Sequence, residues 1–280
     1  MRTIKKYFAA ILILAGMLTF VSCDKEDNDN ELSTESVALT NETAATEMAE
    51  EEIFTSINHA IELSERDNGL KSATILNDCA TISIKPLIGG YPKTITIDFG
   101  TGCSGTRGIR RSGAISFSIS DSLRTPGAQL EVTFNDFSVN GFSVSGAMSF
   151  ENTSAGMVQA FYQETDLVMK TKEGIVITKT KTANRQWIEG SDTEDDISDD
   201  VFQVTSTADV NTSSGASYSY TVKEPLVISA SCDMIKEGVI ELTTSEKEEP
   251  VTIDFGDGEC DLKILLSEKN IAGREINLTK

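Results

Sequence analysis

The sequence predicts a mainly β protein, an antiparallel β meander or sandwich with one N-terminal amphipathic helix. From Cys79 to the C-terminus, nearly every segment alternates apolar and polar residues, which is typical of half-buried strands. Turn-forming residues separate these segments, and only residues 42–66 carry apolar side chains at helical spacing. We therefore expect about 13 to 15 strands joined by short turns, without the helical crossovers that a parallel sheet requires.

The leader, residues 1–22, precedes this body. Basic residues stand before an apolar run that ends in Ser22-Cys23. The run of about 15 apolar residues is short for a bilayer-spanning helix, which needs roughly 20. The pattern predicts a secretory signal with a lipoprotein cleavage box, and the alternative is an uncleaved anchor helix. Acyl chains on Cys23 would hold the mature protein on a membrane almost permanently.

Residues 23–41 follow as an acidic, Ser/Thr-rich stretch with few apolar side chains. Such a segment cannot bury enough apolar surface to offset its ordering entropy, so we expect a flexible tether. Asp24, Lys25, Glu26 and Asp27 resemble the acidic export signal that sends lipoproteins of Bacteroidota to the outer face of the outer membrane. In enterobacteria, an Asp directly after the cysteine instead signals retention in the inner membrane, which is the alternative location.

Residues 42–70 contain the expected helix and its stop signal. One apolar stripe recurs every four residues: Ala45, Ala49, Ile53, Ile57 and Ile61. We expect this stripe to pack on the sheet, and the alternative is a detachable helix that docks on a partner. Five glutamates lie mostly off the stripe: Glu47, Glu50, Glu51, Glu62 and Glu65. His59 lies opposite the stripe, so we expect it to face solvent and to take no catalytic role.

Four cysteines remain after lipidation, and they bracket two copies of a repeat. The run Thr96–Cys103 (TIDFGTGC) returns as Thr252–Cys260 (TIDFGDGEC), with one inserted residue. An even number of cysteines in an exported protein predicts two disulfides, which three connectivities satisfy. The favoured pairs, each bracketing one copy, are Cys79 with Cys103 and Cys232 with Cys260. Four free buried thiols are the alternative, and no Cys-x-x-Cys spacing favours zinc.

An acidic loop, residues 191–200, separates two halves of the body, 71–190 and 201–280. Each half contains one cysteine pair, so we expect two β units, with one continuous domain as the alternative. Clustered carboxylates supply the hard oxygen ligands that calcium prefers, although the spacing here is not that of an EF-hand. The candidate calcium ligands are Asp192, Glu194, Asp195, Asp196, Asp199 and Asp200. We expect a solvated loop and no cofactor, with calcium as the one candidate ion.

Charge and motifs argue against several activities. The formal net charge of −20 becomes −23 without the leader, so the surface repels nucleic acid. Asp98 and Asp254, at equivalent repeat positions, are expected to form turns rather than the paired carboxylates of a glycosidase. Glycines and arginines in residues 100–111 are expected to make turns and to offset the acidic surface, because no helix follows to bind an anion. Trp187, the sole tryptophan, is expected in the core.

The acidic residues after Cys23 and the two Thr-Ile-Asp-Phe-Gly-x-Gly runs, each ending in a cysteine, resemble uncharacterised lipoproteins of Bacteroidota. The likeness covers roughly residues 20–30 and 75–280. It implies an all-β body that is lipid-anchored to the outer membrane and faces the cell exterior. These motifs are structural, so the resemblance implies no catalytic residue.

We expect a binding or interaction protein rather than an enzyme, with an unknown protein, glycan or lipid as its ligand. One alternative is a carrier of a hydrophobic ligand or lipid in a β groove, and the other is a carboxylate-based glycosidase. A groove too large for its own side chains to fill would favour the carrier, whereas a filled core would favour the interaction protein.

Overall fold

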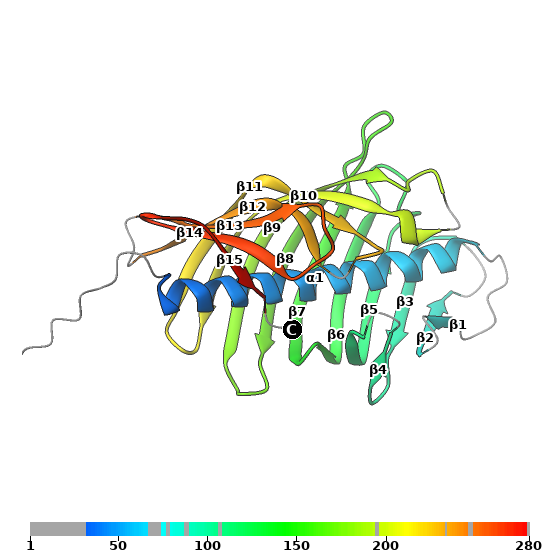
Figure 1. Ribbon diagram of the computed structural model, residues 1–280. Coiled ribbons are helices and arrows are strands. Elements are labelled where there is room, and N and C mark those ends of the chain that lie inside the picture. Colours follow the sequence, from blue (N-terminus) through cyan, green and yellow to red (C-terminus); the bar gives the residue numbers. More distant parts are fainter. Residues whose placement is uncertain are drawn as a thin grey trace, which may run out of the picture.

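The computed structural model describes residues 32–66, 74–76, 79–86, 90–105, 108–193, 196–232, 234–245 and 249–278. Within these ranges the chain forms a long helix followed by fifteen strands and one short 3-10 turn (Figure 1). The bounds are α1 Thr34–Arg66, β1 Thr74–Leu76, β2 Ala80–Lys85, β3 Lys93–Asp98, β4 Cys103–Ser104, β5 Arg110–Ile119, β6 Gln129–Val139, β7 Phe142–Asn152, β8 Gln159–Lys170, β9 Val176–Glu189, η1 Ile197–Asp199, β10 Val201–Thr212, β11 Ser217–Ser229, β12 Ile235–Thr244, β13 Val251–Asp257, β14 Lys263–Glu268 and β15 Ile271–Asn277. The leader, Cys23 and most of the expected tether lie outside the described residues.

The strands form one antiparallel sheet that follows the order of the chain. The hydrogen-bonded path runs β1-β2-β3-β5-β6-β7-β8-β9-β10-β11-β12-β13-β14-β15, and β4 pairs with β5 beside it. The predicted architecture, mainly antiparallel β with one N-terminal helix, is confirmed. Strands β9 and β10 pair across the acidic loop, with Phe202 opposite Trp187. The residues on either side of that loop therefore belong to one continuous sheet.

Tight hairpins account for the regularity of this meander. Asn140 and Gly141 connect β6 to β7 with φ angles of 47° and 91°. Positive φ at both central residues is the mirror-image turn that matches the twist of paired strands. A turn also precedes β9, where the Gly174 N–H donates to the Thr171 carbonyl at 3.0 Å.

Both repeat copies end their strands in the same way. The Asp98 carboxylate accepts a hydrogen bond from the Gly100 N–H at 2.8 Å, and Asp254 accepts one from the Gly256 N–H at 2.9 Å. Both glycines have positive φ, which a residue with a Cβ adopts only with strain. The two aspartates are therefore turn formers, as expected.

Two disulfides link the strand ends next to these turns. Cys79 is bonded to Cys103 and Cys232 to Cys260, with Cα–Cα distances of 5.5 and 5.9 Å. This is the favoured connectivity, in which each bond closes one repeat copy. By the chain-entropy model, each closed loop contributes roughly 3 to 4 kcal/mol.

Helix α1 begins eight residues before the expected start at residue 42, so part of the expected tether is helical. Ser33 is the N-cap, since its hydroxyl accepts a hydrogen bond from the Ser36 N–H at 3.1 Å. The Ser33 N–H in turn donates to Glu268 of β14 at 2.7 Å, which fixes the start of the helix on the sheet. Alanine and glutamate, which favour helix, dominate the turns that follow.

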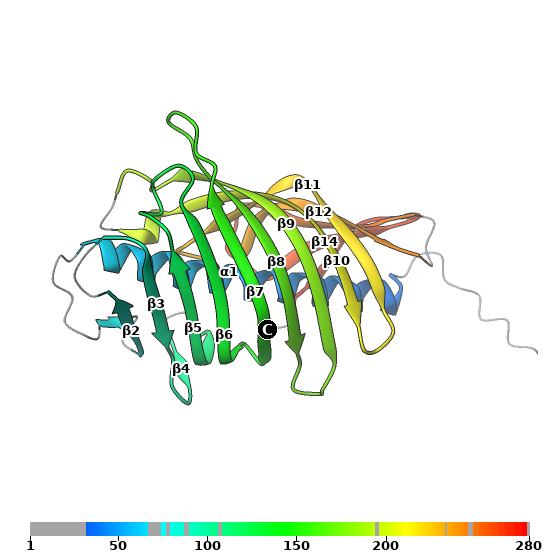
Figure 2. The same cartoon turned by 180° about the vertical axis from the view of Figure 1, so that it is seen from behind.

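The sheet curls around α1, which crosses the inner side of the strands (Figures 1 and 2). The expected stripe is buried: Ile53, Ile57 and Ile61 are at most 2% exposed. Inward side chains of the strands complete one continuous apolar core with them. Because the sheet approaches α1 from more than one side, the helix is a central element rather than a cover on one face.

Candidate functional site

The middle of α1 is buried on its polar side as well as on its apolar stripe. Glu47, Glu50 and Glu51 are 0%, 0% and 7% exposed, and Glu62 is 8% exposed. These glutamates, which the sequence places mostly off the apolar stripe, are therefore buried together with it. A stripe pattern assumes a helix on the face of a flat sheet, whereas this sheet curls around α1 and leaves only one narrow side of the helix, including Ala45, Met48 and His59, partly exposed.

Two lysines of β9 neutralise the deepest carboxylates. Lys179 lies 2.6 Å from Glu50, and Lys181 lies 2.9 Å from Glu47 and 2.8 Å from Glu50. Lys179 also pairs with Glu47, so each ammonium group bridges both carboxylates. All four side chains are inaccessible to solvent. The Tyr220 hydroxyl of β11 donates a further hydrogen bond to Glu47.

The pKa values follow from these contacts. Burial alone would raise the pKa of Glu47, but the ammonium groups of Lys179 and Lys181 outweigh burial and lower it. Burial would lower the pKa of Lys181, and the carboxylates of Glu47 and Glu50 instead raise it. The Tyr220 pKa is also raised, first by burial and then by Glu47. Glu47 is therefore ionised and Lys181 protonated at neutral pH.

Two arginines add further ion pairs to this charged layer. Arg185 of β9 pairs with Glu51, and its Nε donates to the Gln163 side chain at 3.0 Å. Arg111 of β5 lies 2.6 Å from Glu52. The expectation that the arginines of residues 100–111 offset an acidic surface is thus wrong for Arg111, which points into the core.

One sequence signal could have revealed this layer. Strand β9 buries alternate residues, and the buried set consists of Ile177, Lys179, Lys181, Ala183, Arg185 and Trp187. The two ends of this set are apolar, so the cations between them must share the inward face. Lys179, Lys181 and Arg185 were missed because the alternate residues Thr178, Thr180 and Thr182 are polar as well.

A second acidic contact lies near the C-terminal end of α1. Asn58 donates to the Asp200 carboxylate at 3.1 Å, and Asp200 is 1% exposed. Burial, followed by the nearby charges of Glu62 and Asp199, raises the pKa of Asp200 to about 8. The nearest cation, Arg124, lies 3.8 Å from Glu62 and stacks on the Trp187 ring. Trp187 is buried, as expected.

The candidate calcium ligands do not converge among the described residues. Asp196 caps η1 by accepting from the Ser198 N–H, and Asp199 accepts from the Thr193 hydroxyl. Asp200 points inward instead, while Asp192 stays exposed. Glu194 and Asp195 lie outside the described residues. The rest of the described chain also shows no group of three or more His, Cys, Asp or Glu side chains that could hold a metal.

Cavities beside α1 are too small for an organic ligand. One, next to Met48 and Met234, measures about 20 Å³, and another, between Phe54 and Asp200, measures about 10 Å³. Either volume is close to that of a single water. Buried side chains of α1 and of the strands form one continuous apolar core in the trough around the helix.

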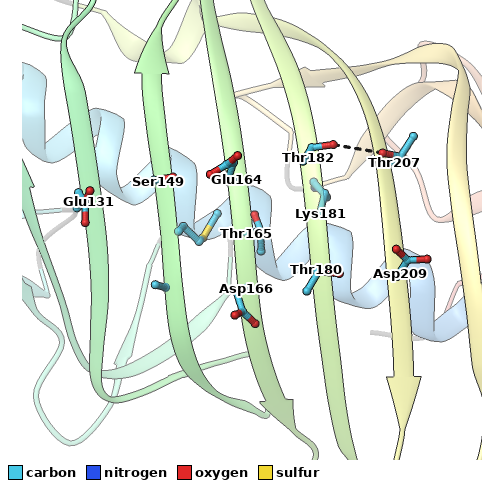
Figure 3. A pocket seen from close by; sticks show the side chains of 12 residues that line it. Glu131, Ser149, Glu164, Thr165, Asp166, Thr180, Lys181, Thr182, Thr207 and Asp209 are labelled. Atoms are coloured by element: carbon cyan, nitrogen blue, oxygen red, sulfur yellow. Dashed lines mark hydrogen bonds between the residues drawn. The ribbon is translucent and has the colours of Figure 1, made fainter.

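The outer side of the same strands carries an open hollow of about 530 Å³ (Figure 3). Figure 3 views this face with α1 behind the strands, so the hollow lies on the side away from the helix. Its exposed or half-buried side chains come from β6 to β10 and are carboxylates or small polar and apolar groups: Glu131, Ala147, Ser149, Glu164, Asp166, Thr180, Thr182, Thr207 and Asp209. Lys181 contributes only from beneath, because its ammonium group is buried against α1. The exposed lining is therefore acidic and rich in hydroxyl groups.

His59 is half-buried near the end of α1. Asp98 and Asp254, the equivalent aspartates of the repeat, both serve turns. The structure thus gives the two aspartates structural roles.

No family model, curated protein or solved structure matches this chain. No helix within the described residues is both long enough and apolar enough to cross a bilayer.

Proposed function

We propose that this protein is a lipid-anchored binding protein of the cell surface, which engages its partner through the outer face of β6 to β10. The observation that carries this proposal is the division of the sheet into two faces. The inner face is filled by α1, whereas the outer face holds an open hollow of about 530 Å³. A filled interior favours an interaction protein over a carrier of a hydrophobic ligand.

The chemistry of the hollow favours a cationic, hydrophilic partner. Glu131, Glu164, Asp166 and Asp209 are exposed there, and no exposed cation shares the lining. Threonine and serine hydroxyls between them can donate or accept hydrogen bonds. A Lys/Arg-rich protein segment would find complementary charge on this face, which speeds encounter and excludes acidic partners.

The membrane anchor in this proposal rests on the sequence around Cys23. Because α1 begins at Thr34, about ten residues separate the lipidated cysteine from the folded body. An extended chain of that length spans at most about 35 Å. The body would therefore stay close to the membrane and present its outer face within reach of other surface proteins.

The binding proposal is tested with a fluorescent oligolysine peptide and protein freed of its lipid by Cys23→Ala. The triple variant Glu164→Gln, Asp166→Asn, Asp209→Asn should weaken binding by roughly tenfold, because it removes the charges that face the peptide. The matched control Glu173→Gln, Glu189→Gln, Glu224→Gln removes the same charge from exposed sites elsewhere and should have little effect. Equal loss in the two variants would refute a specific acidic site.

The anchor is tested in cells. Wild-type protein should fractionate with the outer membrane and be cleaved by protease added outside, whereas Cys23→Ala should be released. Wild-type protein that survives external protease, while a surface control is digested, would contradict the surface location.

A further inference from the structure

With one exception, the buried charges are divided by sign between the helix and the sheet. Among the described residues, every buried cation comes from the sheet: Arg111, Lys179, Lys181 and Arg185. All buried carboxylates except Asp200 come from α1: Glu47, Glu50, Glu51, Glu52 and Glu62. Helix α1 thus supplies the buried carboxylates, and the sheet supplies the cations that bind them.

The helix is also the element that can leave with the least damage to the backbone. Strands β2 to β14 are each hydrogen-bonded to neighbours, so removing one would break the sheet. Helix α1 satisfies most of its own backbone groups, and its links to Glu268, Arg111, Lys181 and Arg185 each involve the side chain of the sheet residue. It is joined to the first strand through one stretch of chain, between Arg66 and Thr74.

We infer that the trough of the sheet is a receptor for α1 of a second copy, and that two copies can exchange helices to form a dimer. In that dimer the same contacts form between chains: Glu47 and Glu50 of one copy meet Lys179 and Lys181 of the other. Exchange of identical elements is a low-cost route to a dimer, since each interface reproduces contacts already present in the monomer. This partner differs from the cationic partner proposed for the outer face.

The shape of the trough favours a helix over a small anionic amphiphile. A helix of 33 residues is about 50 Å long, and α1 crosses most of the sheet (Figure 1). The carboxylates that meet β9 stand at positions 47, 50 and 51, a spacing that lies on one side of a helix. The cavities next to Met48 and next to Phe54 of α1 measure only about 20 and 10 Å³. The cations of β9 are thus spaced to bind carboxylates that follow one another along one side of a helix.

The covalent connection permits such an exchange. Seven residues, 67–73, separate the last residue of α1 from the first residue of β1. At full extension a segment of this length spans at most about 25 Å. Two copies can therefore trade helices when the β1 ends of their sheets lie side by side.

Reversed charges provide a specific test, in full chains released by Cys23→Ala. The helix variant Glu47→Lys, Glu50→Lys and the sheet variant Lys179→Glu, Lys181→Glu each place like charges together within one chain. Reciprocal exchange between these two variants restores opposite charges at both interfaces. We expect each alone to give little folded protein, and the two refolded together to give a dimer containing one of each, with at least about tenfold more folded protein.

The quadruple variant that carries all four substitutions is the matched control, because its charges are opposite again within one chain. If the quadruple variant folds while the mixture yields no more folded protein than either component, helix exchange is refuted. Wild-type chains with two different tags provide an independent measurement that needs no altered core. Co-refolding should give dimers carrying both tags by native mass spectrometry, and monomers at every concentration would overturn the inference. A monomer that instead carries a bound anionic amphiphile would also overturn it and would assign the trough to a small ligand.

Discussion

The middle and the C-terminal end of α1 are buried to a similar degree but in opposite electrostatic settings. In the middle, Glu47 meets Lys179 and Lys181, and its pKa falls. At the end, Asp200 meets Glu62, and its pKa rises to about 8. Burial alone therefore does not decide the charge of a core carboxyl group. The partner within reach decides whether the folded state keeps the proton or releases it.

These settings give opposite dependences of stability on pH. Glu47 has a lowered pKa, so its contribution is present above its ordinary value of 4.5 and is lost as the pH falls below it. Asp200 has a raised pKa, so the folded state holds a proton that the unfolded chain releases above about 3.8. Its contribution is present at low pH and is lost as the pH rises through about 8. Together, these two groups should make stability rise as the pH increases to about 4.5 and fall as the pH increases further toward about 8.

The largest expected effect comes from breaking the ion pairs in the middle of α1. Lys181→Met should lower the free energy of unfolding by about 3 to 5 kcal/mol, because it leaves excess negative charge buried on Glu47 and Glu50. Thr180→Ala, one residue away on the outer face, should change it by less than about 0.5 kcal/mol. Urea denaturation of both variants measures the difference, and equal midpoints would mean that the charged layer does not hold the helix.

The apolar stripe should show a somewhat smaller effect. Ile57→Ala should cost about 2 to 5 kcal/mol, because Ile57 is 2% exposed and its truncation leaves a cavity. His59→Ala, at a half-buried site two residues along, should cost less than about 1 kcal/mol. Chemical denaturation compares the two. If His59→Ala lowered the free energy of unfolding as much as Ile57→Ala does, the apolar stripe would contribute no more to stability than the rest of the helix.

The C-terminal end should give a pH-dependent effect of intermediate size. Raising the pH from 5 to 8 should destabilise wild-type protein through Asp200, by an amount on the order of 2 kcal/mol. Asp200→Asn cannot ionise, so its stability should change less over the same interval. Thermal unfolding at several pH values provides the comparison, and parallel curves for the two proteins would remove Asp200 as the cause.

The smallest effect is expected on the outer face. Neutralising Glu164 and Asp166 should leave the free energy of unfolding within about 0.5 kcal/mol of wild type, because both carboxylates are exposed. The same change should weaken the binding of a cationic peptide. A large loss of stability would mean that these carboxylates serve the fold rather than a partner.

Local patterns in the sequence were sufficient for the strands, the turns and the disulfides. The apolar and polar alternation after Cys79 and the Asn140-Gly141 pair each depend on neighbours along the chain, as does the repeat that brackets each cysteine pair. Whether Glu47 and Arg111 are buried or exposed depends instead on how far the sheet curls, and no local sequence pattern encodes that curvature. The early start of α1 was missed because Ser33 and Ser36 look like tether residues until the cap and Glu268 are seen together.

Hydrogen exchange along α1 tests most directly the claim that opposite charges fix its middle while like charges loosen its end. The account predicts that amides from Ala44 to Ile57 exchange only through global unfolding at both pH 6 and pH 8. Amides from Asn58 to Arg66, corrected for intrinsic rates, should lose protection at pH 8 as Asp200 ionises, and Asp200→Asn should restore it. Uniform protection along the whole helix at both pH values, unchanged by Asp200→Asn, would contradict the account.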